Sequence, residues 1–406
     1  MAKKLTVMIV DDDERRANSW LDQLNSMKLD GFNFESRSQD GIRKIFDSLS
    51  NRLKKARAHD NWHSEPCELD AVDVLLIDFD LLEVTEQTGE QIAYLVRVLS
   101  KAKLIYVINQ WGTNRFDLTL VNGLDSHSDL DIGSEQILNL GLWHPPQATT
   151  GYRPWHWPNL TEEIANYDAR VADVKNNMGR NLLEFFGFDP ALEDIEQSPP
   201  RKALSFFNGL PQELTFASLS SKTNHTFIRL KDAEWLINDP DQLAHIAAFA
   251  IHKWLERWVL PHQDILIDAP HLAARKPWLL KEPPNIKCWN ATVTSDAESA
   301  FQDNLQQYRF TKPHWLSRPA FLGNKINAEV TMAFPKDGWD RNKVPDLVFL
   351  EDMSTFAERD ASQEFVCELG SSDDIRFIAN PKKMGEFQGP NDPRKVDYVP
   401  AVRLAL

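Results

Sequence analysis

Short apolar runs alternate with amphipathic helical patterns over the first 145 residues of this chain, and this alternation restricts the fold more than any other feature. The clearest strand patterns are Leu5–Val10 and Val72–Ile77, and apolar residues at helical spacing follow each of them. Further strands are expected at Phe32–Ser36, Leu104–Ile108 and Ile137–Trp143. Strands that alternate with helices predict an α/β domain built on a parallel sheet.

The remaining sequence divides the chain into further segments. With 406 residues, the chain is too long for one compact core. Residues 1–147 carry the alternating pattern, and residues 148–200 are predicted to form a helical linker that ends near Ser198-Pro199-Pro200. Residues 201–406 are predicted to form an α+β effector or interaction domain, for which the sequence indicates no family. Its clearest strand pattern is Val344–Leu350.

Composition restricts the location and the partners of the protein. Its net charge of −15 makes bulk attraction to nucleic acid or to an anionic membrane unexpected, so nucleic acid could bind only through a local patch. The sequence has no apolar run long enough to span a bilayer and no pattern of a signal peptide. Its three cysteines form no CxxC pair. We therefore expect a cytoplasmic protein without disulfides or membrane contact.

Aspartates follow two of the predicted strands at the point where each strand ends. Asp11 and Asp12 come directly after the first strand, and Asp78 comes directly after Val72–Ile77. Because the carboxyl ends of parallel strands share one edge of a sheet, these side chains are expected to meet there. Three carboxylates repel one another unless a cation neutralises them, and Mg²⁺ prefers oxygen ligands. The alternative is a set of acidic loop ends without a metal.

These segments resemble the receiver domain of bacterial two-component response regulators, the CheY-like fold. The resemblance rests on residues 7–13, residues 73–81 and Gly89, and it covers about a third of the chain. It implies a doubly wound parallel five-stranded sheet, with Asp11 and Asp12 as the acidic pair of a Mg²⁺ site. It also implies that Asp78 is a metal ligand and the phosphoacceptor, and that a histidine kinase or another signalling protein is the partner.

Two other marks of that family are altered here. Asn109 follows the fourth strand, where receivers carry Thr or Ser. If Ile137–Trp143 is the fifth strand, His144 stands where receivers carry a lysine, and Gln110–Gln136 is an unusually long connection. An asparagine can donate a hydrogen bond to a phosphoryl oxygen, and a histidine is shorter than lysine and titrates near neutral pH. Two alternatives result: Mg²⁺-dependent phosphorylation at Asp78, or a pseudo-receiver that serves as a docking module.

In the second half, Asp268 and His271 follow the apolar run Ile265–Ile267. They could serve as a general base with its orienting partner. No serine or cysteine nucleophile in an elbow motif accompanies them. The other interpretation is a strand end at which the aspartate caps the following turn.

A basic and aromatic window without any acidic residue extends from Asn304 to Ala328. Its candidate binding residues are Arg309, Lys312, Trp315 and Arg318. Basic side chains interleaved with aromatic rings are suited to single-stranded nucleic acid or a phosphorylated partner. The alternative is a solvated face with a few core aromatics.

Together these features predict a bacterial signalling protein in which an atypical receiver regulates or docks the C-terminal domain. A second hypothesis is a hydrolase or nuclease in the C-terminal domain, with the receiver as a docking module. A third is a non-catalytic scaffold in a stress or phage-response system. A second copy of the chain is a further candidate partner.

Overall fold

The computed structural model describes residues 4–109, 126–144, 151–155, 157–188, 214–216, 235, 239–294, 296–330, 340–366 and 375–380. In its first part, strands and helices alternate along the chain. The strands are β1 (Leu5–Val10), β2 (Phe32–Arg37), β3 (Val74–Asp78), β6 (Leu104–Asn109) and β7 (Leu130–Gly133). The main helices between them are α1 (Glu14–Ser26), α2 (Gln39–Arg57) and α4 (Gly89–Leu99). A small antiparallel ladder of β4 (Asp80–Leu81) and β5 (Gln87–Thr88), with α3 (Leu82–Thr85) between its strands, joins β3 to α4.

These five strands form one all-parallel sheet in the order β2-β1-β3-β6-β7. The prediction of a mixed α/β architecture with a five-stranded parallel sheet is therefore confirmed. The order is one of the two common doubly wound arrangements, in which ligands bind at the carboxyl edge where the chain reverses direction across the sheet. Val10 pairs with Ile77 and Asp78 pairs with Ile108, so the carboxyl ends of these strands lie at one edge.

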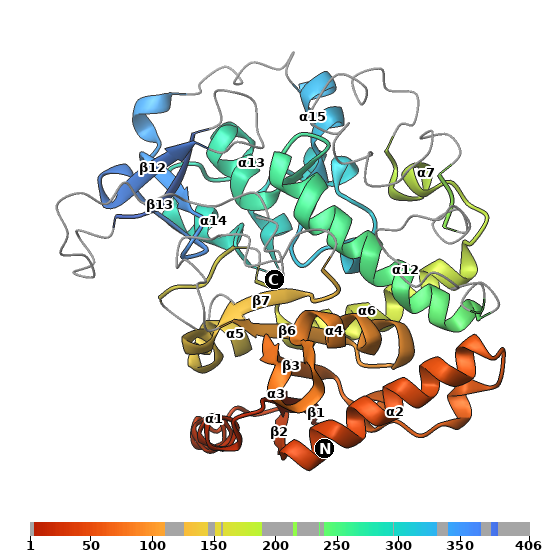
Figure 1. Cartoon of the computed structure of the whole chain (residues 1–406). Coiled ribbons are helices and arrows are strands. Elements are labelled where there is room, and N and C mark those ends of the chain that lie inside the picture. The colour runs from red at the N-terminus through yellow and green to blue at the C-terminus, as the bar shows by residue number, and fades with distance from the viewer. Residues whose placement is uncertain are drawn as a thin grey trace.

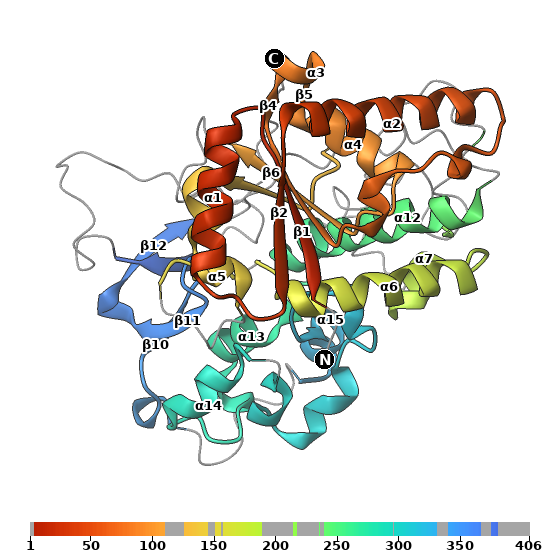
Figure 2. The same ribbon diagram turned by 90° about the horizontal axis from the view of Figure 1, so that it is seen from below.

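Helices cover both faces of the sheet (Figures 1 and 2). On one face, α2 and α4 pack against alternate residues of β1 and β3 such as Met8 and Leu75. On the other face, α1 buries Ala17, Trp20 and Leu24, which the helical spacing places on one side. The helices α5 (Leu140–Trp143) and α6 (Leu160–Asn176) complete that layer. Double coverage explains why β3 and β6 are buried along their whole length.

The fifth strand is not where the sequence pattern placed it. The strand predicted at Ile137–Trp143 is wrong, because a 3₁₀ turn (Ser134–Leu138) and α5 occupy that segment. Asn139 accepts a hydrogen bond from the backbone N–H of Gly141 and so begins α5. The fifth strand is β7, which lies inside the connection Gln110–Gln136 and pairs with β6. Residues 110–125 of that connection lie outside the described residues.

The described part of the second half includes a long buried helix, α12 (Pro240–Trp254), which Asp239 caps by accepting from the backbone N–H of Gln242 at 3.0 Å. A four-stranded sheet of order β11-β10-β13-β12 and a two-stranded sheet of β8 and β9 follow. The strands are β8 (Leu266–Asp268), β9 (Ala320–Leu322), β10 (Leu347–Leu350), β11 (Thr355–Glu358), β12 (Ser362–Val366) and β13 (Ile375–Ala379). Further helices within the described residues are α7 (Leu182–Phe186), α13 (Ala269–Arg275), α14 (Ile286–Ala291) and α15 (Gly323–Val330).

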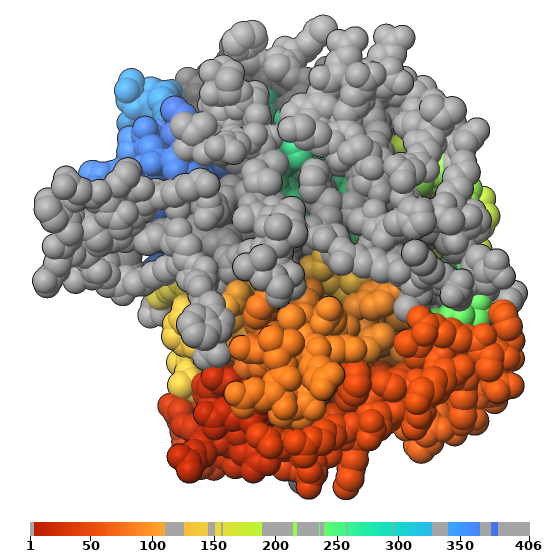
Figure 3. Space-filling view, in the orientation of Figure 1, coloured from red at the N-terminus to blue at the C-terminus, as the bar shows by residue number. Residues whose placement is uncertain are grey.

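The two halves pack closely against each other. The helix α6 contributes Leu160 and Ile164 to the core of the parallel sheet, and Tyr167 and Val171 to the core of the second half. Figure 3 shows the N-terminal residues, red to orange, as one continuous lower part of the molecule. The domain boundaries predicted after residues 147 and 200 lie outside the described residues.

None of the helices in the described part of the chain has the length and apolar character that crossing a bilayer requires.

Candidate functional site

The three predicted aspartates meet at the carboxyl edge of the parallel sheet. Asp11 follows β1 directly, and Asp78 is the last residue of β3. One carboxylate oxygen from each of Asp11, Asp12 and Asp78 lies within 4.8 Å of the others. Asp11 and Asp78 are buried, whereas the side chain of Asp12 is 14% exposed. All three donors are oxygen atoms, which is the ligand type that Mg²⁺ prefers.

The turn after β1 is fixed by its own side chains. Asp11 Oδ1 accepts a hydrogen bond from the backbone N–H of Asp13 at 2.8 Å. Asp13 in turn caps α1, since its Oδ1 accepts from the backbone N–H groups of Arg15 at 2.9 Å and Arg16 at 3.3 Å. Asp13 is therefore a capping residue, and the helix that it begins carries Arg16 toward the aspartates.

Gly89 packs directly against the backbone of Asp78. A Cβ atom at position 89 would lie 2.1 Å from the carbonyl oxygen of Asp78, so a larger residue requires the backbone to move. The backbone N–H of Gly89 donates to the carbonyl of Phe79 at 2.7 Å. Gly89 is the first residue of α4, and Thr88 and Gln91 form a capping box at that end. The amino end of α4 is thus held against the last residue of β3.

Arg16 places a guanidinium group among the aspartates. Its Nε lies 2.6 Å from Asp11 Oδ2, and its Nη2 lies 2.7 Å from Asp11 Oδ1. The same Nη2 lies 2.6 Å from Asp78 Oδ2 and 3.5 Å from Asp12 Oδ1. Sequence reasoning missed this residue. Its position four residues after Asp12, in the first turns of the following helix, is the pattern from which it could have been found.

The electrostatics of the edge remain unfavourable for negative charge. Burial, and then the charge of Asp11, raise the pKa of Asp78 to about 7 although the charge of Arg16 lowers it. Burial and Asp11 also raise the pKa of Asp12. The hydrogen bond to Asp11 is the main cause that raises the pKa of Arg16.

A hollow of about 670 Å³ opens beside the aspartates, and its lining includes the acidic side chains of Asp12, Asp13, Glu14, Asp80 and Glu83. Only two basic residues, Arg15 and Arg16, join them among the lining residues in the described chain. One more cation is therefore electrostatically favoured at this edge.

The two residues predicted to replace the switch residues of receivers lie in different places. Asn109 is buried at the end of β6, one residue beyond the partner of Asp78. It therefore lies at the acidic edge. His144 does not end the fifth strand, and this prediction is wrong. It comes after Trp143, whose ring contacts Phe32 at the amino end of β2, and Figure 2 shows α5 away from the edge that carries α3.

Asp268 and His271 do lie together, in a second buried cluster. His271 Nδ1 lies 2.6 Å from Asp268 Oδ1, and its Nε2 lies 2.7 Å from Glu351 Oε1. Asp268 also accepts from the backbone N–H of His271 and so caps α13. Burial alone would lower the pKa of His271, but the two carboxylates raise it above the usual value. Glu351, which follows β10, was not predicted as a member.

This second cluster has the geometry of a structural bridge. Both ring nitrogens of His271 are hydrogen-bonded to carboxylates, so neither is free to take a proton from a substrate or nucleophile. Arg376 Nη1 lies 3.3 Å from Glu351 Oε1 and adds a buried positive charge. The enzyme hypothesis therefore has no available general base at His271 in this arrangement.

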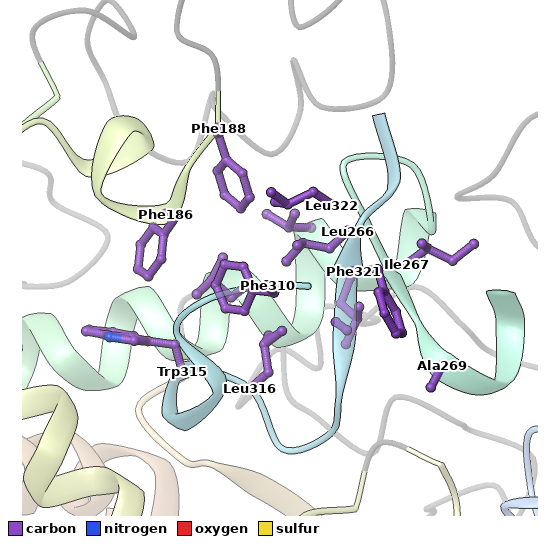
Figure 4. Packing of buried hydrophobic residues seen from close by; sticks show 14 of the residues in the cluster. Phe186, Phe188, Leu266, Ile267, Ala269, Phe310, Trp315, Leu316, Phe321 and Leu322 are labelled. Carbon is purple, nitrogen blue, oxygen red and sulfur yellow. The ribbon is translucent and has the colours of Figure 1, made fainter. Parts of the chain in front are cut away.

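The aromatic side chains of the basic and aromatic window lie in the core. Trp315 is fully buried among other aromatic rings (Figure 4), and its Nε1 donates to Asp173 Oδ2 at 2.9 Å. Lys312 Nζ lies 4.1 Å from the ring centroid of Phe185. Arg309 is paired with Glu298 at 2.5 Å, and Arg318 with Glu256 at 3.3 Å. Because Trp315 is enclosed, it offers no face on which a base could stack.

Comparison with protein-family models, with curated proteins and with solved structures finds no match to this chain. Its function is therefore inferred from the fold and from the geometry of the acidic edge.

Proposed function

We propose that this chain is a signalling protein in which a receiver-like sheet, with its acidic edge at Asp78, regulates or docks the second half. The observation that carries the proposal is the meeting of Asp11, Asp12 and Asp78 at the carboxyl edge of a parallel sheet, beside Gly89. The strand order, the meeting of the three aspartates and the close approach of Gly89 to Asp78 support the proposal.

The residues present fit a hard divalent cation, because their donors are carboxylate oxygens. Asp11, Asp12 and Asp78 would hold Mg²⁺, which when bound supplies the positive charge that lets a phosphoryl group approach this edge. Arg16 must then release its hydrogen bonds to Asp11 and Asp78. A carboxylate oxygen of Asp78 would attack the phosphorus, while the P–N bond of a phosphohistidine or the P–O bond of a phosphate anhydride breaks and the histidine or carboxylate leaves. Asn109 lies at the same edge and carries an amide that can donate to a phosphoryl oxygen. A histidine kinase or a small phosphate anhydride is the donor class.

The helix α4 provides a physical connection from this edge to the second half. Its amino end begins at Gly89, against the backbone of Asp78. At its carboxyl end, the carbonyls of Arg97 and Ser100 accept hydrogen bonds from Gln242 Nε2 on α12, at 3.1 and 3.2 Å. The Arg97 guanidinium also lies 4.0 Å from the ring centroid of Phe249. A shift of α4 at the acidic edge would therefore displace contacts with α12.

A second candidate is a docking module that needs neither metal nor phosphate. It is favoured by Arg16, whose guanidinium already neutralises Asp11 and Asp78 from within the chain. Here Arg16 is a permanent internal cation that keeps the edge in one state, and the sheet serves as a binding surface for a signalling partner.

Intact mass after incubation with acetyl phosphate and Mg²⁺ separates the two candidates. The wild type should gain one phosphoryl group, and Asp78→Asn should gain none. Arg15→Gln is a control substitution beside the acidic edge, because Arg15 lines the same hollow and its side chain is exposed. If wild type and Asp78→Asn both stay unmodified while Mg²⁺ and the phosphodonor are in excess, phosphorylation is refuted and the docking module remains.

A further inference from the structure

A separate cavity of about 290 Å³ lies between the segment that leads into α6 and the second half of the chain. Its lining includes Arg153, Trp155 and Trp157 from the first segment, and Arg309, His314 and Arg318 from the second. The backbone of Arg153 is fixed here, because its N–H donates to the carbonyl of Asp352 at 2.9 Å and its carbonyl accepts from Ser354 Oγ at 2.8 Å.

The guanidinium of Arg153 is buried without a carboxylate partner among the described residues. Arg153 is 4% exposed, and its Nη2 donates to the carbonyls of Trp157 at 2.9 Å and Pro158 at 3.4 Å. Its Nε has no hydrogen-bond acceptor within the described chain. Burial, and then the charge of Arg318, lower the pKa of Arg153 to about 9, so the group is still charged at neutral pH. An isolated buried cation is unfavourable unless an anion neutralises it.

Arg318 provides a second guanidinium beside it. The central guanidinium carbon of Arg318, Cζ, lies 3.9 Å from the ring centroid of Trp155, and Nη2 lies 3.3 Å from Glu256 Oε2. The Nε of Arg318 also lacks an acceptor among the described residues. Glu256 is shared, because it also accepts from the backbone N–H of Ser317. Among the described residues, Glu256 is thus the one carboxylate paired with either of these two guanidinium groups, and both groups face the cavity.

The other charged residues of the lining do not cancel this excess. Arg309 is paired with Glu298, and His314 with Asp173. Glu162 is exposed, so water screens its charge. The apolar part of the wall includes Leu316, which is buried.

We propose that this cavity binds a small phosphomonoester, with its phosphoryl group between Arg153 and Arg318. A phosphate dianion carries enough charge and enough acceptor oxygens for two guanidinium groups, whereas a single carboxylate neutralises only one. The volume is at the lower limit of small-molecule sites, which restricts the ligand to about the size of a mononucleotide. The inference does not depend on the acidic edge or on the proposed function.

The test is thermal unfolding and calorimetric titration of the full chain with inorganic phosphate and with AMP as probes. Both should stabilise and bind the wild type, and sodium acetate at equal ionic strength should not. Arg153→Met should weaken binding about 30-fold or more. Its melting temperature without ligand should equal or exceed that of wild type, because the variant removes a buried charge that has no described carboxylate partner. Arg43→Met, at an exposed site, is the control and should bind as wild type does.

Two results overturn the proposal: no binding of either probe by the wild type, or unchanged binding by Arg153→Met. A lower melting temperature of Arg153→Met without ligand, with binding retained, would assign Arg153 a structural role instead. If this variant does not fold, Val293→Trp fills the cavity from its partly exposed wall. Loss of AMP binding in that variant supports the site, and retention refutes it.

Discussion

Replacing Arg16 by glutamine tests whether this residue is the internal cation of the acidic edge. The change removes a guanidinium that lies 2.6 Å from oxygens of both Asp11 and Asp78. Without it, no positive partner of the three carboxylates remains among the described residues, and the edge becomes available to an added cation. We therefore expect Arg16→Gln to be less stable than the wild type without metal, and more strongly stabilised by Mg²⁺.

The size of the effect depends on burial. Breaking a fully buried ion pair costs about 3–5 kcal/mol. The Arg16 side chain is 25% exposed, and Asp78, with a pKa of about 7, can take up a proton near neutral pH. The exposure of Arg16 and the protonation of Asp78 together reduce the expected loss of stability to about 2 kcal/mol. At about 2.1 cal/mol/K per residue, this lowers the melting temperature by about 2 °C for cooperative unfolding of the whole chain. If Arg16→Gln binds Mg²⁺ with a Kd of about 1 mM, about 10 mM Mg²⁺ would raise its free energy of unfolding by about 1.4 kcal/mol.

The assay is thermal unfolding of wild type, Arg16→Gln and Arg15→Gln, each in EDTA and in Mg²⁺. Arg15→Gln should match the wild type, because Arg15 is exposed and forms no ion pair within the described residues. Equal stability of wild type and Arg16→Gln in EDTA would refute the role of Arg16. A Mg²⁺ response no larger in Arg16→Gln than in wild type would refute competition between guanidinium and metal.

Three further variants test other parts of the account. Burial and the charge of Asp11 raise the pKa of Asp78 to about 7, so the folded state keeps a proton that the unfolded state loses. The contribution of Asp78 to the free energy of unfolding in EDTA should therefore fall by about 3–4 kcal/mol as the pH rises from about 4 to 7. Denaturant unfolding of Asp78→Asn should lack this slope, and a parallel slope would disprove the assignment. In the same assay, Gly89→Ala should lower the free energy of unfolding by about 1–3 kcal/mol. Gly179→Ala should lower it much less, because position 179 has open space around it. Similar losses in both variants would contradict the close approach of Gly89 to Asp78. Burial lowers the pKa of His271, but its two carboxylates raise it further, so its net pKa lies above the usual value. Its contribution to stability is complete below about pH 6.5 and is lost as the pH rises through the raised pKa. The stability advantage of wild type over His271→Gln should therefore shrink from about pH 6 to 9, and a constant difference would count against the bridge.

The parallel sheet and the position of its aspartates could be predicted because they depend on local patterns. The strands β1 and β3 are short apolar runs, and parallel pairing brings the residues at their carboxyl ends to one edge. The strand β7 could not be predicted in the same way. It contains Asp131 and Gly133 within four residues, so it lacks the apolar pattern of a central strand, while Ile137–Trp143 has that pattern and folds as a turn and a short helix.

Side chains that meet across long sequence distances were harder to predict. The bridge from His271 to Glu351 joins residues 80 positions apart, and no spacing rule relates them. The burial of Trp315 depends on contacts with α7, which is also remote in sequence. Arg16 is different, since it lies one helical turn from Asp12, and only the direction of its side chain required the structure.

The central claim is that the state of Asp78 reaches the second half through α4. Hydrogen–deuterium exchange of the full chain, with and without Mg²⁺ and acetyl phosphate, tests it most directly. We predict altered exchange in wild type both at the amino end of α4 and in α12 near Gln242, and no such change in Asp78→Asn. A change confined to the acidic edge, with α12 unaffected, would contradict the claim.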